Sequence, residues 1–205
     1  MKISIMIPWR SDGPDGWRQE VWGYLRPKWE EIGWELCIGE DNRYELPFSA
    51  ALAFNRAAAQ ATGDVLVTMG ADFYPNPEAI EKAATLTTYK SSWVMIFGAV
   101  GYLSEGDTKK LIREGADINT LRFGIVDPTC QGITAISRTA WDAVGGMDER
   151  YRGWGWEDTD LNRRLGRKYG YATYPYTRAI SLWHPMNHRD LSYNNPNRRL
   201  FESEA

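Results

Sequence analysis

The stretch SAALAFNRAAAQATGDVLVTMGAD, residues 49–72, carries a helix followed by a strand, and this pair decides the fold class. Ser49 is a typical N-cap, an alanine-rich helix follows, and Gly63 suits the end of that helix. Val65–Met69 is a short apolar run of the kind found in buried strands. Asp72 then places a carboxylate just past the strand.

The same alternation continues on both sides of this stretch. Further strands are expected at Ile3–Ile7, Trp34–Ile38 and Trp93–Val100, and further helices at Trp17–Trp29, which Pro27 bends or ends, and after the Asn76-Pro77-Glu78 cap. This order predicts an α/β fold with a mostly parallel sheet and helices on both faces. Ligands of such sheets bind beyond the carboxyl ends of the strands, which draws attention to Arg10, Asp41 and Asp72.

The second half of the chain is less regular. Tyr102–Asp127 is rich in glycine and charge with a brief helical signal, and is interpreted as a mobile connection that a ligand orders. Thr139-x-x-Asp142 resembles a capping box before a short helix that stops at Gly145-Gly146. Glu157–Lys168 is a stronger amphipathic helix, and the tail after Trp183 is polar.

Length and composition limit the class of protein. The 205 residues fit one domain, and 43% hydrophobic with 25% charged residues is typical of a globular protein. A net charge of −3 excludes a general basic surface for nucleic acid, and no apolar run is long enough to span a membrane. The N-terminus reads as a strand, not a secretion signal, and Cys37 and Cys130 are expected to be free thiols, so a cytoplasmic location is expected. Ten Trp and eleven Tyr offer rings for stacking on sugars or bases.

An aromatic and acidic segment, YRGWGWEDTDL at residues 151–161, is the most specific motif. Glycines let the backbone approach a ligand, Trp154 and Trp156 offer flat faces, and three acids open a helix. Glu157 and Asp158 point about 100° apart on a helix, so one can bind while the other does chemistry. Acids at a helix start also complement its dipole, but that does not explain the preceding Gly-Trp-Gly-Trp.

Metal ligands are sought among Asp72 and the two histidines. A carboxylate just past a strand can hold a divalent cation that neutralises a diphosphate, although Asp72 also suits a turn cap before Pro75. His184 follows an apolar stretch and can ligate through a ring nitrogen, but a single histidine is often only a satisfied polar group. His188 lies among polar residues and is the second choice.

Together, these stretches resemble the GT-A glycosyltransferases, above all the family-two enzymes and the beta-1,4-galactosyltransferase group. Residues 5–10, IMIPWR, resemble the first strand with its nucleotide-binding Pro-aromatic-Arg. Residues 55–64, NRAAAQATGD, resemble the helix and turn before the metal strand. Residues 145–149 with 153–161 resemble the acceptor and catalytic-base segment, and Trp183-His184 resembles the late histidine of the metal site.

The resemblance implies a single GT-A domain over residues 1–205, with a nucleotide-sugar-binding half at 1–100 and an acceptor and catalytic half at 101–205. It implies a UDP-sugar donor, a divalent metal (Mn²⁺ in the first place), and inverting transfer with Asp158 as general base and Glu157 as a sugar contact. The implied donor contacts are Pro8, Trp9, Arg10, Asp41, Asn55 and Ala71. The implied acceptor contacts are Trp154, Gly155 and Trp156, and the implied metal ligands are Asp72 and His184, with His188 behind them.

The sequence departs from the family pattern at two positions. The usual Asp-x-Asp reads Gly70-Ala71-Asp72, which lacks one carboxylate, and the usual second glycine before Glu-Asp is Trp156. Two other classes are weighed. A non-catalytic carbohydrate-binding module explains the tryptophans but not Asp72, Asp158 and His184. A sugar-nucleotide pyrophosphorylase requires a glycine-rich basic loop that residues 9–13 do not provide. The acceptor stays open among a glycan, a protein, a small molecule and modified DNA, as does the oligomeric state.

Overall fold

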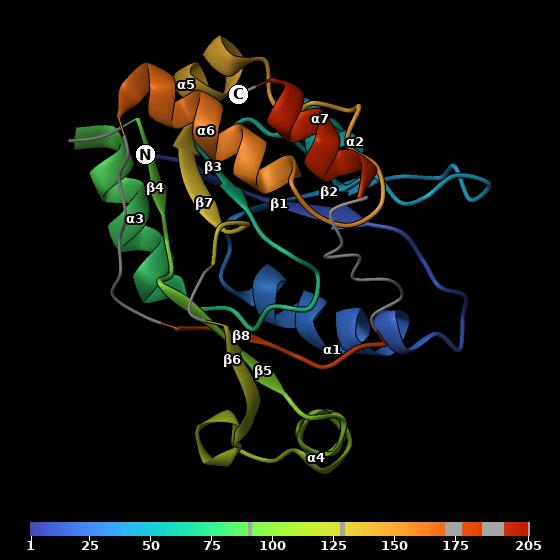
Figure 1. Ribbon diagram of the computed structural model, residues 1–205. Coiled ribbons are helices and arrows are strands. Elements are labelled where there is room, and N and C mark those ends of the chain that lie inside the picture. The colour runs from blue at the N-terminus through green and yellow to red at the C-terminus, as the bar shows by residue number, and fades with distance from the viewer. Residues whose placement is uncertain (90–91, 128–129, 171–177, 186–194, 205) are drawn as a thin grey trace.

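The computed structural model describes residues 1–89, 92–127, 130–170, 178–185 and 195–204, and its central sheet has the strand order β2-β1-β3-β7-β4 (Figure 1). The strands are β1 (Ile3–Trp9), β2 (Glu35–Glu40), β3 (Val65–Thr68), β4 (Trp93–Met95) and β7 (Thr134–Ser137). β1 pairs parallel with β2 and β3, and β7 is antiparallel to both β3 and β4. All strands except β7 therefore run in one direction, which confirms the expected mostly parallel sheet.

Helices cover both faces of this sheet, as expected. The helices are α1 (Trp17–Glu31), α2 (Ala50–Gln60), α3 (Pro77–Tyr89), α5 (Arg138–Val144) and α6 (Glu157–Tyr169). Successive side chains of a strand point to opposite faces. Ile5 of β1 therefore joins one apolar core with α1 and α3, while Met6 joins a second core with α2, α5 and α6. In the described part of the chain, no helix is long and apolar enough to cross a membrane.

A second, smaller sheet extends from the first and has the order β6-β5-β8. Its strands are β5 (Ala99–Leu103), β6 (Phe123–Asp127) and β8 (Arg178–Ser181). The expected single strand Trp93–Val100 is therefore wrong, because the chain leaves the central sheet after β4 and enters the second sheet at β5. In Figure 1 this sheet and the helix that follows β5 lie below the central sheet.

The segment Tyr102–Asp127, which the sequence predicts to be a mobile connection with a brief helical signal, has more regular structure than expected. This segment contains α4 (Glu105–Glu114), a 3₁₀ turn (Ile118–Thr120) and β6. Ser104 caps α4 by accepting a hydrogen bond from the Asp107 amide, and Gly115 ends it in the left-handed conformation. These are the same start and stop signals that locate the other helices, and Leu111 anchors α4 to the core.

Three further helix boundaries differ from expectation. α1 continues through Pro27. Proline cannot donate a hydrogen bond to the carbonyl of Gly23, but both residues face solvent, so water can bond to that carbonyl. α5 begins two residues earlier, with Ser137 instead of Thr139 as the cap. The polar tail contains α7 (Pro196–Ser203), which begins with the same Asn-Pro signal that opens α3.

Candidate active site

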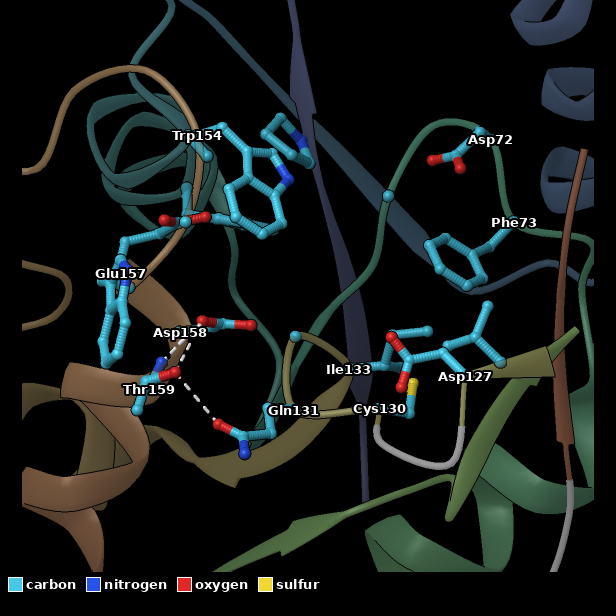
Figure 2. Close-up of a pocket in the computed structure, with 18 of the residues that line it drawn as sticks. Asp72, Phe73, Asp127, Cys130, Gln131, Ile133, Trp154, Glu157, Asp158 and Thr159 are labelled. Carbon is cyan, nitrogen blue, oxygen red and sulfur yellow. Dashed lines mark hydrogen bonds between the residues drawn. The ribbon is translucent and has the colours of Figure 1, made fainter. Parts of the chain in front are cut away.

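A cavity of about 580 Å³ lies at the carboxyl edge of the central sheet. Figure 2 shows Trp154, Glu157 and Asp158 on one side of it, with Asp72 and Asp127 across from them. Lysine and arginine are absent from its described lining, although four carboxylates belong to that lining. The cavity therefore has a negative potential that favours a cation or hydroxyl groups.

Left-handed backbone conformations aim the start of α6 at this cavity. Gly153 and Gly155 have φ values of 76° and 88°, and Trp156 has a φ of 78°. A tryptophan rarely adopts this conformation, and the strain costs on the order of 1–3 kcal/mol. The Trp156 ring packs on Phe201 of α7, with ring centroids 5.1 Å apart. Position 156, where the resembled family carries glycine, thus has a backbone conformation suited to glycine. The packing of its ring on Phe201 stabilises the tryptophan in this conformation.

Asp158 is oriented by its neighbour. Its Oδ1 accepts hydrogen bonds from the Thr159 amide at 2.6 Å and from the Thr159 hydroxyl at 3.2 Å. Burial raises the pKa of Asp158 above its usual value. Within the described part of the chain, no donor is bonded to Oδ2, and this oxygen lies beside Gly132 at the cavity floor. One oxygen is therefore fixed, and the other can accept a proton.

Glu157 is the second carboxylate of the pair. Burial, and then the charge of Asp158, raise the pKa of Glu157 to about 8. Its Oε2 is buried and has no hydrogen-bond partner among the described residues. Glu157 is therefore protonated at neutral pH while Asp158 is the first of the two to ionise, which divides the pair into a hydrogen-bond donor and a base.

The third acid of the segment has a structural task. Asp160 is buried and forms ion pairs with Arg163 at 2.8 Å and Arg164 at 2.7 Å. Arg164 also donates to the carbonyls of Val144 and Gly146, which ties α6 to the end of α5. Both carboxylate oxygens of Asp160 therefore form ion pairs within α6, which gives this residue a structural role.

Asp72 and His184, the expected metal ligands, lie together. The Asp72 Oδ2 is 3.7 Å from the His184 Nε2, and it accepts a hydrogen bond from Ser181 at 2.6 Å. The His184 Nδ1 lies 3.1 Å from the Pro185 carbonyl. Donation from Nδ1 to that carbonyl leaves the Nε2 lone pair facing Asp72, which is the usual orientation of a metal-binding histidine. His188 lies outside the described residues.

The missing first carboxylate has a steric explanation. A Cβ at Gly70 would lie 2.6 Å from the Asp72 Oδ1 and 2.8 Å from the Phe73 ring. A side chain at position 70 therefore displaces Asp72 itself. The donor set in the described chain is one carboxylate and one imidazole, and no cluster of three or more His, Cys, Asp or Glu occurs among the residues searched.

Arg10 and Asp41 form a buried network with each other. The Arg10 guanidinium donates to the Asp41 carboxylate at 2.6 Å and to the carbonyls of Asp41, Arg43 and Leu46. The Asp41 carboxylate also accepts from Arg43 and from the Ser49 amide, and these hydrogen bonds lower its pKa to about 2. Both residues thus hold the loop after β2 in place. Either residue could contact a sugar-nucleotide donor only if these hydrogen bonds were broken.

Asn55 also bonds to protein groups, and it does not line the cavity. Its side chain donates to the Met147 carbonyl and the Glu149 carboxylate, and accepts from the Met147 amide. It therefore fixes the turn after α5. The remaining expected donor contacts, Pro8, Trp9 and Ala71, line a small side cavity of about 140 Å³ together with Asp72 and His184.

Arg18, Asp127 and Asn197 are site residues that sequence reasoning missed. Arg18, on the first turn of α1, lines the small side cavity beside Asp72 and His184. Asp127 ends β6 and brings the second sheet to the main cavity. Asn197 is buried on α7 and forms hydrogen bonds with the backbone of the loop that carries Trp154. The sequence marks these residues only weakly. No motif surrounds Arg18 or Asp127, and the only sign of Asn197 is the Asn-Pro signal that begins α7.

Asn197 fixes the backbone of the loop that carries Trp154. Its side-chain amide donates to the carbonyls of Arg152 and Gly155, both at 2.9 Å, and its carbonyl accepts from the Arg152 amide at 3.2 Å. Trp154 is 41% exposed, so this loop supplies an accessible aromatic face. The side chain that positions the loop thus comes from α7, which lies outside the sequence motif.

We expect Asn197→Asp to raise the KM for an acceptor by about three- to tenfold while kcat changes less, because the amide nitrogen that donates to both carbonyls becomes an oxygen that repels them. Steady-state kinetics against acceptor concentration measures this split. Asn42→Asp makes the same change at an exposed position away from the cavities and is the control. A Trp154 loop that does not depend on this clamp would give equal KM values for the two variants.

Comparisons with known proteins agree with this geometry. The model of glycosyl transferase family 2 matches residues 48–140, and a model described as the N-terminal domain of galactosyltransferase matches residues 119–188. No curated protein matches.

Among solved structures, Staphylococcus aureus TarS aligns with a TM-score of 0.61 at 14% identity, covering 100% of this chain and 66% of that one. Glucosyl-3-phosphoglycerate synthase from Mycobacterium tuberculosis aligns with a TM-score of 0.54 at 13% identity, covering 98% and 77%. Drosophila beta1,4-galactosyltransferase 7 aligns with a TM-score of 0.50 at 17% identity, covering 92% and 66%. The chain thus spans about two thirds of the length of the first and the last of these.

These structures share the fold, and the two family models lie on the segments that build the cavity walls. The galactosyltransferase model covers Asp158 and His184, and the family 2 model covers Asp72. The chain therefore has the GT-A fold of these structures, and two overlapping parts of it, residues 48–140 and 119–188, resemble glycosyl transferase family 2 and the galactosyltransferases.

Proposed function

We propose that this protein transfers a sugar from a UDP-sugar to an acceptor hydroxyl with inversion at the anomeric carbon. One observation carries the proposal: two adjoining cavities, which share Asp72 and Glu157, bring the Asp72–His184 pair and the Glu157–Asp158 pair to one site. The first pair suits a diphosphate with its metal, and the second suits proton removal. In this proposal residues 1–100 supply most donor contacts and residues 101–205 the acceptor and catalytic contacts.

Ligands of the similar structures support the choice of donor and metal. The TarS structure contains UDP-GlcNAc, and the synthase structure contains Mn²⁺, UDP-glucose and phosphoglyceric acid. A structure of a Drosophila galactosyltransferase 7 mutant contains manganese, UDP-Gal and xylobiose. The shared element is a uridine diphosphate sugar.

Asp72 and His184 fit a divalent metal. A carboxylate oxygen and an imidazole nitrogen are ligands that Mn²⁺ accepts, and the orientation of His184 leaves Nε2 available. A cation held by these two side chains would offset the negative charge of the diphosphate as it leaves.

Arg18, and not Arg10, is the guanidinium available to the donor phosphates. Arg10 is held by four hydrogen bonds around Asp41. The Arg18 side chain makes no hydrogen bond or ion pair in the described part of the chain, and it lines the small cavity with Asp72 and His184. We therefore assign phosphate neutralisation to Arg18.

Asp158 removes the acceptor proton as the hydroxyl attacks the anomeric carbon from the side opposite the diphosphate. Thr159 fixes one carboxylate oxygen, so the other points into the cavity where the hydroxyl is placed. The protonated Glu157 donates a hydrogen bond to a sugar hydroxyl and adds no second negative charge. Trp154 supplies the face on which the acceptor stacks.

UDP release tests this function. Wild-type protein with Mn²⁺ is expected to release UDP from at least one of UDP-glucose, UDP-galactose and UDP-GlcNAc, slowly to water and faster with an acceptor. A carbohydrate-binding module would release none. Absence of UDP release from all three donors, with the protein folded and Mn²⁺ present, would reject the UDP-sugar proposal.

The pH profile tests the division of roles within the carboxylate pair. Glu157 loses its proton near pH 8, so activity is expected to fall roughly fourfold between pH 7 and pH 8.5 as the protonated fraction declines. Glu157→Gln keeps a neutral hydrogen-bond donor without a titrating proton, so this alkaline decline should disappear. Initial rates at saturating substrate measure both profiles. An alkaline decline that persists in Glu157→Gln would assign it to another group.

A further inference from the structure

A further chamber is lined by Trp154 but by none of the four carboxylates of the main cavity. Its volume is about 570 Å³, and its walls come from the loop after β1, the loop before α2, residues 152–154 and the start of α7. Its charged lining is Arg10, Asp12, Arg18 and Arg152. This composition contrasts with the main cavity, whose charged side chains are all carboxylates.

Two of these charges already have partners. Arg10 is neutralised by Asp41, at 2.6 Å. The Asp12 carboxylate accepts hydrogen bonds from the backbone amides of Arg18 and Gln19, so its charge interacts with the N-terminus of α1. The side chains of Arg18 and Arg152 have no hydrogen bond or ion pair within the described chain. The chamber therefore offers two uncommitted guanidinium groups.

Trp154 connects this chamber to the reaction site. Trp154 lines the main cavity and the chamber, and it also lines a cavity of about 550 Å³ that shares Asp72 and Glu157 with the main cavity and Arg18 with the chamber. The loop is held in this place from both sides, since Gly153 donates to the Phe48 carbonyl at 2.7 Å and Asn197 bonds to the carbonyls of Arg152 and Gly155. A ligand stacked on Trp154 with a hydroxyl near Asp158 thus extends into a chamber with positive charge.

We infer that this chamber is an acceptor subsite for an anionic group, a phosphate, sulfate or carboxylate carried next to the sugar or ring that receives the new sugar. Arg152 is its main contact, because it lines only this chamber among the cavities described here, whereas Arg18 is shared with the donor side. A guanidinium binds such groups through paired hydrogen bonds. This inference deepens the proposed function and rests on it.

The test compares sugars that differ only in charge. Binding of glucose, glucose 6-phosphate, glucose 6-sulfate and glucuronic acid is measured by ligand-observed NMR with the protein saturated with UDP and Mn²⁺, so that the donor site is filled. The anionic sugars are expected to bind about five- to tenfold tighter than glucose. The advantage should shrink in 0.5 M NaCl because salt screens exposed charges. The phosphate, sulfate and carboxylate arms identify which anion fits.

Arg152→Gln is expected to reduce the advantage of the anionic sugars to less than twofold. Arg167→Gln removes the same charge from an exposed position of α6 and should preserve the advantage. Equal binding of neutral and anionic sugars, no binding of any of the four, or an advantage that survives Arg152→Gln would each overturn the subsite. UDP release by the wild-type protein with Mn²⁺ is measured separately, so failure of this subsite is distinguishable from failure of the proposed transferase.

Discussion

Replacing Asp158 with asparagine is expected to slow sugar transfer by about 10²–10⁴-fold, the usual cost of losing a general base. Asparagine keeps the size of the side chain, but its amide cannot take the acceptor proton. In the proposed site the donor and the metal bind at Asp72 and His184, away from Asp158, so their affinity should stay near that of the wild type. Transfer is measured as UDP release with acceptor, and donor affinity by calorimetry with UDP and Mn²⁺.

Asp142→Asn is the matched control, because Asp142 is exposed on α5 and lines none of the described cavities. Its transfer rate should equal that of the wild type. Thermal unfolding of both variants shows whether a loss of activity reflects a loss of fold. Normal transfer by a folded Asp158→Asn protein would remove the base from this mechanism, and Glu157 would then become the candidate.

Removing the metal is expected to lower donor turnover at least tenfold, whether by EDTA or by Asp72→Ala. Asp72 is one of the two proposed metal ligands, and loss of such a ligand or its support typically costs 10–100-fold in metal affinity or activity. Excess Mn²⁺ should restore the EDTA-treated wild type. It should restore Asp72→Ala only at much higher concentration, because His184 alone remains.

Asp142→Ala serves as the control for the alanine substitution. UDP release is titrated against Mn²⁺ for wild type and both variants, so that a shift in the metal dependence is separated from a uniform loss. Full turnover in EDTA would contradict the metal assignment. Neutralisation of the leaving diphosphate would then fall to Arg18 alone, and Arg18→Gln would become the decisive variant.

Much of this fold follows from local signals in the sequence. Ser49 caps α2 as expected, Asn76 caps α3, and Gly145 ends α5 in the left-handed conformation. The strand Trp93–Val100 was misassigned because an apolar run does not reveal which of two sheets each part joins. β4 and β5 both read as buried strands, and only their partners, β7 and β8, separate them.

Some residues of the candidate site can likewise be recognised from the sequence, and the roles of others cannot. The motif around Asp158 is recognisable in the sequence by its unusual composition, and Asp72 and His184 are recognisable because each follows an apolar stretch. The roles of Arg10, Asp41 and Asn55 are not readable, because a polar residue near a strand end can bind a ligand or hold a loop. Their hydrogen bonds to other loops decide this, and those loops are distant in sequence.

Arg18 and Asn197 are missed for a related reason. Each acts across the fold on a segment far along the chain: Arg18 toward His184, and Asn197 on the Trp154 loop. Neither has a neighbouring motif that marks it. Such contacts depend on how α1 and α7 dock against the rest of the molecule, which a local pattern does not contain.

A crystal of the protein with UDP and Mn²⁺, examined by anomalous scattering of manganese, tests the central claim most directly. The account predicts one strong manganese peak bound to both Asp72 and His184, with the UDP diphosphate beside it near Arg18. It also predicts that the open side of the diphosphate faces Trp154 and Asp158. A nucleotide bound in another part of the molecule, or manganese away from Asp72, would contradict the assignment of these adjoining cavities as the site of sugar transfer.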